Sequence, residues 1–263
     1  MTTIEPEYAI EMAALSDVGT TRARNEDCCA CLPELGLVVV ADGVSGGRGG
    51  DTASSKAVET TSRALREQPA TLPAIKRIVR AAQQANIEVH ELSLFVPELR
   101  GMSTTLTAAL IDRGQLFAAH VGDSRLYLLR DGALSQVSKD HTAAAEHVRI
   151  GVIGDPSTVL TRSLGRDLIC ALDRISLPLL QGDVVLLCSD GLHRVLADPE
   201  MAALLRGADA AGACRALIDA ANARGSPDNL TAGVVRVTGP VPARPRPTGL
   251  GDKILQLVDA LRS

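Results

Sequence analysis

An aspartate at the end of a short apolar run is the first residue that could do chemistry. Leu37 to Val40 is typical of a strand buried on both faces, and the run ends at Asp42-Gly43. The glycine-rich turn Gly46 to Gly50 then lets backbone approach a ligand closely, before a helical stretch begins. A carboxylate held on a rigid strand end suits a hard divalent cation, which takes oxygen ligands. The alternative is an ordinary strand–turn–helix connection in which Asp42 only caps a turn.

Three further aspartates occupy similar places. Asp190 follows the apolar run Val184 to Cys188, Asp228 stands in a turn before the apolar run Leu230 to Val237, and Asp123 lies between two expected strands. We expect these carboxylates to converge with Asp42 at one end of the sheets. An all-oxygen set favours Mg²⁺ or Mn²⁺ over zinc. The competing interpretation is four unrelated turn aspartates, since turns favour this residue.

The elements that must position these acids alternate between strand and helix patterns. Helical spacing predicts helices over 52–68, 72–94, 202–206 and 208–223. Apolar or alternating runs bounded by turn residues predict strands over 8–16, 28–32, 37–40, 103–111, 115–121, 125–129, 133–137, 159–163, 168–172, 183–188 and 230–237. Neighbouring strands joined by short turns pair antiparallel. The pattern therefore predicts an α+β domain with two face-to-face antiparallel sheets and helices outside them.

Composition narrows the class of protein. The 263 residues are 46% hydrophobic with no Trp, two Phe and two Tyr, so the core must consist of Ala, Val, Leu and Ile. A net charge of −4 and the lack of aromatic stacking groups argue against nucleic-acid binding. No apolar window approaches a membrane span, and the N-terminus lacks a signal-peptide pattern, so we expect a cytoplasmic protein without a membrane partner. The six cysteines are expected to be reduced structural thiols.

The chain end differs in composition from the rest. Residues 239–249 hold four prolines and two arginines, which predicts a stiff exposed tail. Ile254, Leu257, Val258 and Leu261 then form a short apolar helical stripe that docks on the domain or on a partner. We expect a catalytic domain over 1–238, with a short flap at about 141–158, and a tail with a short helix over 239–263.

Seven short motifs stand in an order that resembles the metal-dependent serine/threonine protein phosphatases of the 2C type, above all the short bacterial members. They lie between residues 12 and 237 and begin at Arg22, Ala41, Gly122, Lys139, Thr161, Ser189 and Ser226. The resemblance implies a four-layer αββα sandwich with the site in a cleft at one end. It also implies hydrolysis of phosphoserine and phosphothreonine in proteins.

By this resemblance, two Mn²⁺ or Mg²⁺ ions are bridged by Asp42. The Gly43 carbonyl would bind one ion, and Asp190 and Asp228 would complete the other, with Glu26 and Asp27 nearby. Arg22 matches the phosphate-binding arginine, whose planar fork grips two phosphate oxygens. The implied catalytic residues are Arg22, Glu26 and Asp42. A hydroxide bridging the ions would attack phosphorus in line, without a phosphoenzyme.

The chain departs from the family pattern at two places near the site. Val44 stands where some members carry a histidine proposed as the leaving-group acid, so the proton donor is unassigned. Asp123 matches an acid linked to a third, weaker ion, but Arg194 replaces a further acid and its charge disfavours a cation. We therefore predict weak or absent third-ion binding. Ser45 and Arg48 could contact phosphate or lie at the surface, and His141 is expected to be structural.

The expected partners are phosphorylated protein substrates and a cognate serine/threonine kinase. Two alternatives remain: a regulatory or binding module that keeps the fold but has weakened chemistry, and a two-metal hydrolase of another phosphoester. All the matched acids are present, which argues against the module, and Arg194 is the feature in its favour.

Overall fold

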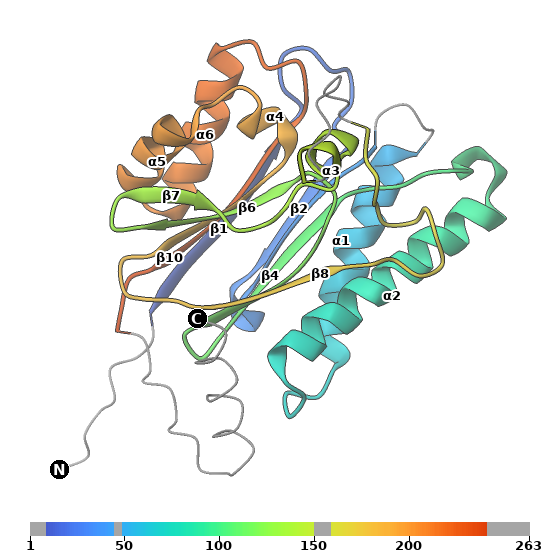
Figure 1. Ribbon diagram of the computed structural model, residues 1–263, viewed down its shortest axis with the longest axis horizontal. Coiled ribbons are helices and arrows are strands. Elements are labelled where there is room, and N and C mark those ends of the chain that lie inside the picture. Colours follow the sequence, from blue (N-terminus) through green and yellow to red (C-terminus); the bar gives the residue numbers. More distant parts are fainter. Residues whose placement is uncertain (1–8, 45–48, 150–158, 241–263) are drawn as a thin grey trace.

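Two antiparallel sheets of five strands each pack face to face in the computed structural model, which describes residues 9–44, 49–149 and 159–240. Figure 1 shows helices outside both sheets, which gives the expected four-layer αββα sandwich. One sheet has the order β1 (Ile10–Asp17), β10 (Leu230–Val237), β9 (Val184–Cys188), β6 (Arg125–Arg130), β7 (Ala133–Gln136). The other has the order β2 (Asp27–Leu32), β3 (Leu37–Asp42), β4 (Leu106–Asp112), β5 (Gln115–Val121), β8 (Asp173–Pro178).

Strand β3 confirms the prediction of a strand buried on both faces. Val38 and Val40 face the other sheet, in a cluster that includes Leu187 and Val235, whereas Val39 belongs to the cluster under the helices. Side chains alternate between the two faces of a strand, so one apolar run serves two cores. This double burial fixes the end of β3, where Asp42 lies.

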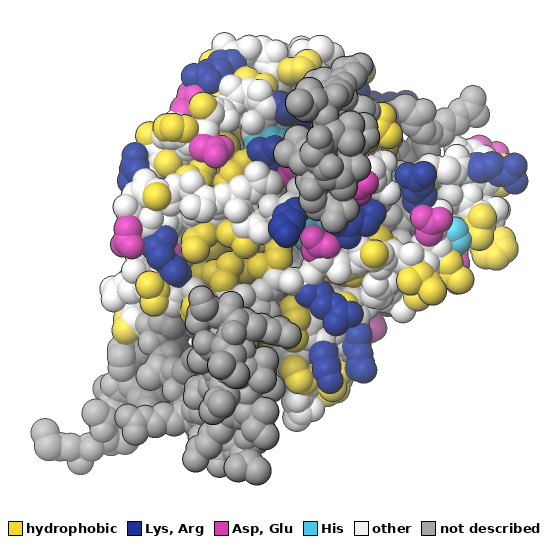
Figure 2. All heavy atoms as spheres, viewed as in Figure 1, with side chains coloured by type: hydrophobic (Ala, Val, Ile, Leu, Met, Phe, Trp, Pro, Cys, Tyr) yellow, Lys and Arg dark blue, Asp and Glu magenta, His cyan; other side chains and the backbone are white. Residues whose placement is uncertain are grey.

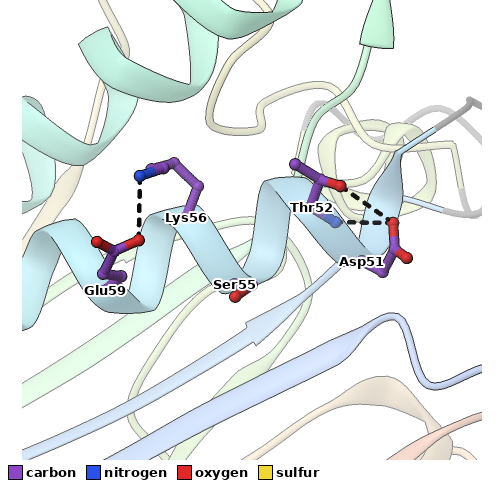
Figure 3. A pocket seen from close by; sticks show the side chains of 5 residues that line it. All are labelled: Asp51, Thr52, Ser55, Lys56 and Glu59. Carbon is purple, nitrogen blue, oxygen red and sulfur yellow. Dashed lines mark hydrogen bonds and ion pairs between the residues drawn. The ribbon is translucent and has the colours of Figure 1, made fainter. Parts of the chain in front are cut away.

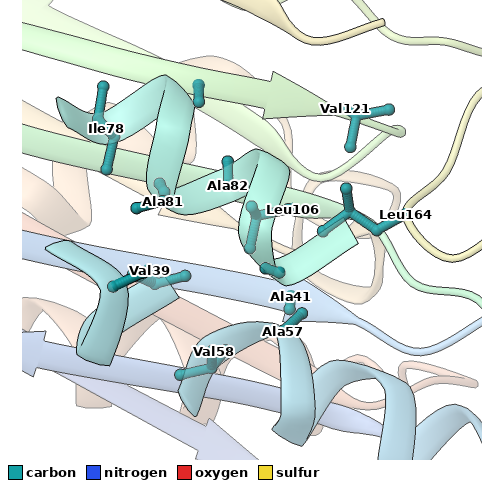
Figure 4. Close-up of a cluster of buried hydrophobic side chains, with 14 of the residues drawn as sticks. Val39, Ala41, Ala57, Val58, Ile78, Ala81, Ala82, Leu106, Val121 and Leu164 are labelled. Atoms are coloured by element: carbon teal, nitrogen blue, oxygen red, sulfur yellow. The ribbon is translucent and has the colours of Figure 1, made fainter. Parts of the chain in front are cut away.

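Helices α1 (Gly50–Glu67) and α2 (Ala74–Phe95) cover one sheet, on the right in Figure 1. Alanines such as Ala57 let the helices approach closely, and Figure 4 shows Val39, Ile78 and Leu106 in the layer between helices and sheet. Helices α5 (Asp198–Arg206) and α6 (Ala210–Ala223) cover the other sheet. Small and branched aliphatic residues therefore build the core, as the near absence of aromatic residues predicts.

The predicted strands over 159–163 and 168–172 are wrong. Leu160 forms only an isolated bridge, and Leu168 and Ile169 are 60% and 82% exposed. The strand of this region is β8, which starts at Asp173 and pairs with β5. Four short helical segments were not expected: α3 (Ala143–Arg149), α4 (Asp190–His193) and the 3-10 turns η1 (Pro33–Leu35) and η2 (Pro97–Leu99). Helix α5 also begins earlier than predicted, because Ala197 to Pro199 supplies its first turn.

The cysteines, the lengths of the helices and the chain end were also the subject of predictions. All six cysteines are free, and burial raises the pKa of the Cys188 thiol to about 12, as expected of structural thiols. Within the described residues, no helix is both long and apolar enough to cross a bilayer. Most of the predicted tail, including the stripe at 254–261, and the second half of the predicted flap lie outside the described residues.

Candidate active site

The predicted aspartates meet at one end of the sandwich. Asp42 ends β3, Asp190 begins α4 directly after β9, Asp123 follows β5, and Asp228 precedes β10. All four line one cavity of about 900 Å³. Asp27, the first residue of β2, is the direct cross-strand partner of Asp42. The strand ends therefore bring together carboxylates that are up to 200 positions apart in the chain.

The backbone around Asp42 is held by neighbouring strands and not by the carboxylate itself. The Asp42 N–H donates to Thr105 Oγ1 at 2.9 Å, and Thr104 Oγ1 donates to the Asp42 carbonyl at 2.8 Å. Gly43 donates its N–H to the Glu26 carbonyl at 3.0 Å. A Cβ on Gly43 would lie 2.7 Å from that carbonyl oxygen, so only glycine fits. The side chain of Asp42 lines the cavity.

Asp27 is buried beside the cavity and is fixed by two hydroxyl groups. Ser189 Oγ and Thr231 Oγ1 each donate to Asp27 Oδ2 at 2.7 Å. The pKa of Asp27 is raised to about 6, because burial and the charge of Asp190 together outweigh the two hydroxyl bonds, which lower it. Asp27 is therefore placed to support its neighbour Asp42 from behind the cavity wall.

The gathered carboxylates repel one another. Burial, followed by the charges of Asp27, Asp190 and Asp123, raises the pKa of Asp42 well above its usual range. Burial and the charge of Asp190 raise the pKa of Asp123 to about 6, against the opposing effect of Arg194. Such a cluster gains stability from any cation that enters it.

Two arginines pair with carboxylates that line the cavity. Arg22 Nη2 lies 2.9 Å from Asp228 Oδ2, and its Nε donates to the Pro227 carbonyl at 3.2 Å. Arg194 Nη2 lies 2.8 Å from Asp190 Oδ2 and 3.2 Å from Asp123 Oδ2. Both arginines line the cavity. Each guanidinium thus occupies a carboxylate oxygen that a metal ion would use.

The donor atoms of these residues decide whether they could hold a metal ion. Among the described residues, no three His, Cys, Asp or Glu side chains form a group that could by itself hold a metal ion. Three of the carboxylates, those of Asp228, Asp190 and Asp123, pair with arginines. The donor atoms are nevertheless all oxygen, and together they carry excess negative charge. The pKa of Asp42, one of these donors, is raised. We conclude that the donors fit hard divalent cations, which would replace the arginines on those oxygens.

Asn229 holds the loop that carries Arg22 and Glu26, a role that sequence reasoning missed. Its Nδ2 donates to the carbonyls of Val18 and Arg24 at 2.9 Å each, and its Oδ1 accepts the Glu26 N–H at 2.9 Å. The only signal in the sequence was its position directly after Asp228. The Glu26 carboxylate lies near the start of α1, with Oε1 3.0 Å from where a Cβ of Gly50 would be.

The other predicted positions divide as follows. Val44 lines the cavity, and its apolar side chain cannot donate a proton to a leaving group. His141 is buried, accepts the Gly122 N–H at 3.1 Å and lies 3.2 Å from Asp173, which agrees with a structural role beside Asp123. Ser45 and Arg48 lie outside the described residues.

A second hollow, of about 290 Å³, lies on the outer face of α1 and is lined by Asp51, Thr52, Ser55, Lys56 and Glu59. Figure 3 shows its charged groups satisfied locally: Lys56 pairs with Glu59 at 3.0 Å, and Asp51 accepts the Thr52 N–H at 2.8 Å. It brings together no groups from distant parts of the chain. The chemistry therefore belongs to the larger cavity.

Known proteins are similar to this chain in sequence and in fold. The serine/threonine phosphatase stp of Listeria monocytogenes is 34% identical over 230 residues, which cover 82% of this chain and 91% of the relative. PppA, a key regulatory component of T6SS in Pseudomonas aeruginosa, is 36% identical with a TM-score of 0.77, over 88% of this chain and 98% of PppA. The catalytic domain of the phosphatase PstP in complex with two manganese ions is 33% identical with a TM-score of 0.79, over 87% of this chain and 98% of that domain.

The chain also matches the sequence pattern of a whole protein family. A family model of protein phosphatase 2C matches residues 20–232, which include Arg22, Asp42, Asp190 and Asp228. Together with the shared sandwich and the convergence of the acids, this match means that the chain belongs to the protein phosphatase 2C family.

Proposed function

We propose that this protein is a metal-dependent protein serine/threonine phosphatase, which releases inorganic phosphate from phosphoserine and phosphothreonine. The observation that carries the proposal is the convergence of Asp42, Asp190 and Asp228 with Arg22 on one cavity. The relatives named as serine/threonine phosphatases support it.

We assign the metal-binding role to the residues at the strand ends. Asp42, the Gly43 carbonyl, Asp190 and Asp228 would hold two Mn²⁺ or Mg²⁺ ions, as two manganese ions are bound by the PstP catalytic domain. Glu26 and Asp27 would support them, and Asp123 would reach a third, weaker ion. When bound, the cations lower the pKa of water and stabilise negative charge on the phosphoryl group.

The chain's own residues then bind and orient the substrate. Arg22 uses only two of its five N–H donors on Asp228 and Pro227, so other donors of its fork remain for phosphate oxygens. Asp27 keeps Asp42 in place through the β2–β3 pairing. Val44 offers no proton, so we infer that the departing hydroxyl takes its proton from solvent.

The alternative of a binding module with weakened chemistry has one observation in its favour. Arg194 engages Asp190 and Asp123, which places a fixed cation among the proposed ligands. The remaining proposed ligands, Asp42 and Asp228, are in place in the same cavity. We therefore favour the enzyme.

The setting of the enzyme is inferred from its chemistry. Substrates are phosphorylated proteins, and we propose that a cognate serine/threonine kinase supplies them. The six free cysteines support a reducing compartment, which agrees with a cytoplasmic location. We place the catalytic domain at residues 1–238, with the tail at 239–263 outside it.

Release of phosphate from a phosphothreonine peptide tests the proposal. We expect turnover with Mn²⁺ that is lost in EDTA and lost in Asp42→Ala. Asp219→Ala, which removes an exposed carboxylate on α6, serves as the control and should keep full turnover. Metal-independent turnover, or none in the parent protein, would refute the enzyme assignment, and turnover of nucleotides alone would indicate a different phosphoester substrate.

A further inference from the structure

The cavity extends well beyond the acid cluster. Its far wall is formed by the C-terminal end of α2 and by the segments around Gly101 and Gly165, and the described residues there include His90, Leu94, Arg100, Leu160 and Arg166. A volume of about 900 Å³ exceeds what a phosphorylated side chain and two ions fill. The far part therefore has room for residues that flank the phosphorylated one.

Charge is distributed unevenly between the two ends. Four arginines are among the described lining residues: Arg22 and Arg194 pair with carboxylates at the acid end, whereas Arg100 and Arg166 lie at the far end. In the described part of the chain, neither Arg100 nor Arg166 forms an ion pair. Arg166 has only a long contact, 3.5 Å from its Nη1 to the Leu160 carbonyl. All the described carboxylates that line the cavity belong to the acid end.

The backbone beneath Arg166 is anchored although its side chain is exposed. Gly165 donates its N–H to Asn86 Oδ1 at 2.9 Å, and its carbonyl lies 3.0 Å from His90 Nδ1. Gly165 has φ +87°, and a Cβ there would be 3.1 Å from the Met102 carbonyl oxygen, so only glycine permits this approach. The loop is thus fixed against α2.

Arg100 is anchored in a similar way. The Gly101 N–H donates to Ser93 Oγ on α2 at 2.9 Å, and the Met102 N–H donates to the Leu99 carbonyl at 3.0 Å. The next residues lead back to the acid end, where Ser103 accepts the Val44 N–H at 3.0 Å. Both arginines therefore extend from an anchored backbone, so binding orders only their side chains.

The rim beside these arginines is partly apolar. Leu94 and Phe95, at the end of α2, are 58% and 79% exposed. Figure 2 shows hydrophobic side chains among charged ones over this part of the molecule, on the right. Unpaired guanidinium groups beside apolar surface suit an extended peptide with an anionic group.

We propose that Arg100 and Arg166 bind a second anionic group of the substrate, a carboxylate or a second phosphate, within a few residues of the phosphorylated side chain. This inference rests on the proposed function. It makes the enzyme selective for acidic or multiply phosphorylated segments. The acid end of the cavity takes the reacting phosphate, and the far end takes the second charge.

Matched phosphothreonine peptides test this selectivity. One series carries Ala at three positions on either side, and others replace a single Ala by Glu, phosphoserine or Lys. We expect kcat/KM for the best Glu or phosphoserine peptide to exceed that for the Ala peptide at least about fivefold, mainly through KM. Comparing Glu with phosphoserine then distinguishes the two sources of negative charge.

Variants connect the preference to the two arginines. In the double variant Arg100→Gln/Arg166→Gln, the ratio between the anionic and the Ala peptide should fall to nearly one. Arg80→Gln, which removes an exposed positive charge on α2 outside the cavity, should keep the ratio. An equal rate for Ala and anionic peptides in the parent, or a preference that persists in the double variant, would overturn the inference.

The two proposals fail in different ways. If no peptide is turned over, the proposed function is wrong, and binding of the same peptides, measured by fluorescence anisotropy, then decides about the arginines. Tighter binding of anionic peptides that is lost in the double variant supports the site, and equal affinities overturn it.

Discussion

Replacement of Arg194 by glutamine should strengthen metal binding. The Arg194 guanidinium contacts Asp190 and Asp123, so a cation that takes these oxygens must first displace it. The side chain is 43% exposed, so each pair is screened and contributes only about 0.5–1 kcal/mol. Loss of both pairs corresponds to about 1–2 kcal/mol, which is roughly a tenfold gain in Mn²⁺ affinity.

The same substitution should have the opposite effect on the protein without metal. In EDTA, Arg194→Gln leaves Asp190 and Asp123 without their counter-charge, so its free energy of unfolding should fall by about 1–2 kcal/mol. Isothermal titration with Mn²⁺ measures the affinity and the number of sites, and urea unfolding measures the stability. Two strong sites are expected in the parent. Three sites of comparable affinity would contradict the predicted weakness of the third.

Arg224→Gln is the matched control. Arg224 pairs with Glu200 at 2.7 Å and is 46% exposed, but it does not line the cavity. With one ion pair, Arg224→Gln should lower the free energy of unfolding by about 0.5–1 kcal/mol without any change in Mn²⁺ affinity. If Arg194→Gln binds Mn²⁺ no better than the parent, the guanidinium does not compete with the metal, and the reasoning is refuted.

Three further changes test the fold and the site. Burial lowers the pKa of His120 to about 4, so the unfolded chain takes up a proton at this residue before the folded chain does; this opposes the raised pKa values of Asp27 and Asp123, and the stability of the parent relative to His120→Gln in urea titrations should fall by up to about 3 kcal/mol between pH 6.5 and 4. Gly43→Ala should lower the free energy of unfolding by about 1–3 kcal/mol and reduce turnover, whereas Gly207→Ala, with room for a Cβ, should not. Asp42→Asn should abolish turnover with Mn²⁺, yet in EDTA at pH 7.5 it should raise the melting temperature, because it removes the repelled charge; a lower melting temperature would argue against repulsion.

Local patterns were enough to predict where the acids lie. Asp42 and Asp190 each come at or just after the end of an apolar strand that is buried on both faces. The first acidic residue after such a run lies at the end of the strand, where the sandwich opens to solvent. The strand prediction over 168–172 failed for the opposite reason, because Leu168 and Ile169 are apolar yet exposed on a loop. The strand β8 just beyond this loop alternates exposed and half-buried side chains, a pattern that the apolar run obscured.

Contacts between distant segments could not be predicted from local patterns. Asn229 bonds to groups more than 200 positions away, and no feature of its own neighbourhood indicates those partners. The resemblance predicted that Arg194, which stands where relatives carry an acid, disfavours a third cation, but it did not predict that Arg194 pairs with both Asp190 and Asp123. Charge type is readable from one residue, whereas the identity of its partners depends on the packing of the whole sandwich.

The hydrogen bonds around the site explain how a repulsive cluster is kept in place. The backbone of Asp42 is fixed by Thr104 and Thr105, and the side chain of Asp27 by Ser189 and Thr231. These bonds come from strands whose burial stabilises them independently of the carboxylates. The free energy of folding therefore comes from the apolar layers, and the acids are held where they repel one another. A cation that enters such a site must displace the guanidinium groups of Arg22 and Arg194, but the backbone that carries the carboxylates is already held in place by residues that do not touch the cation.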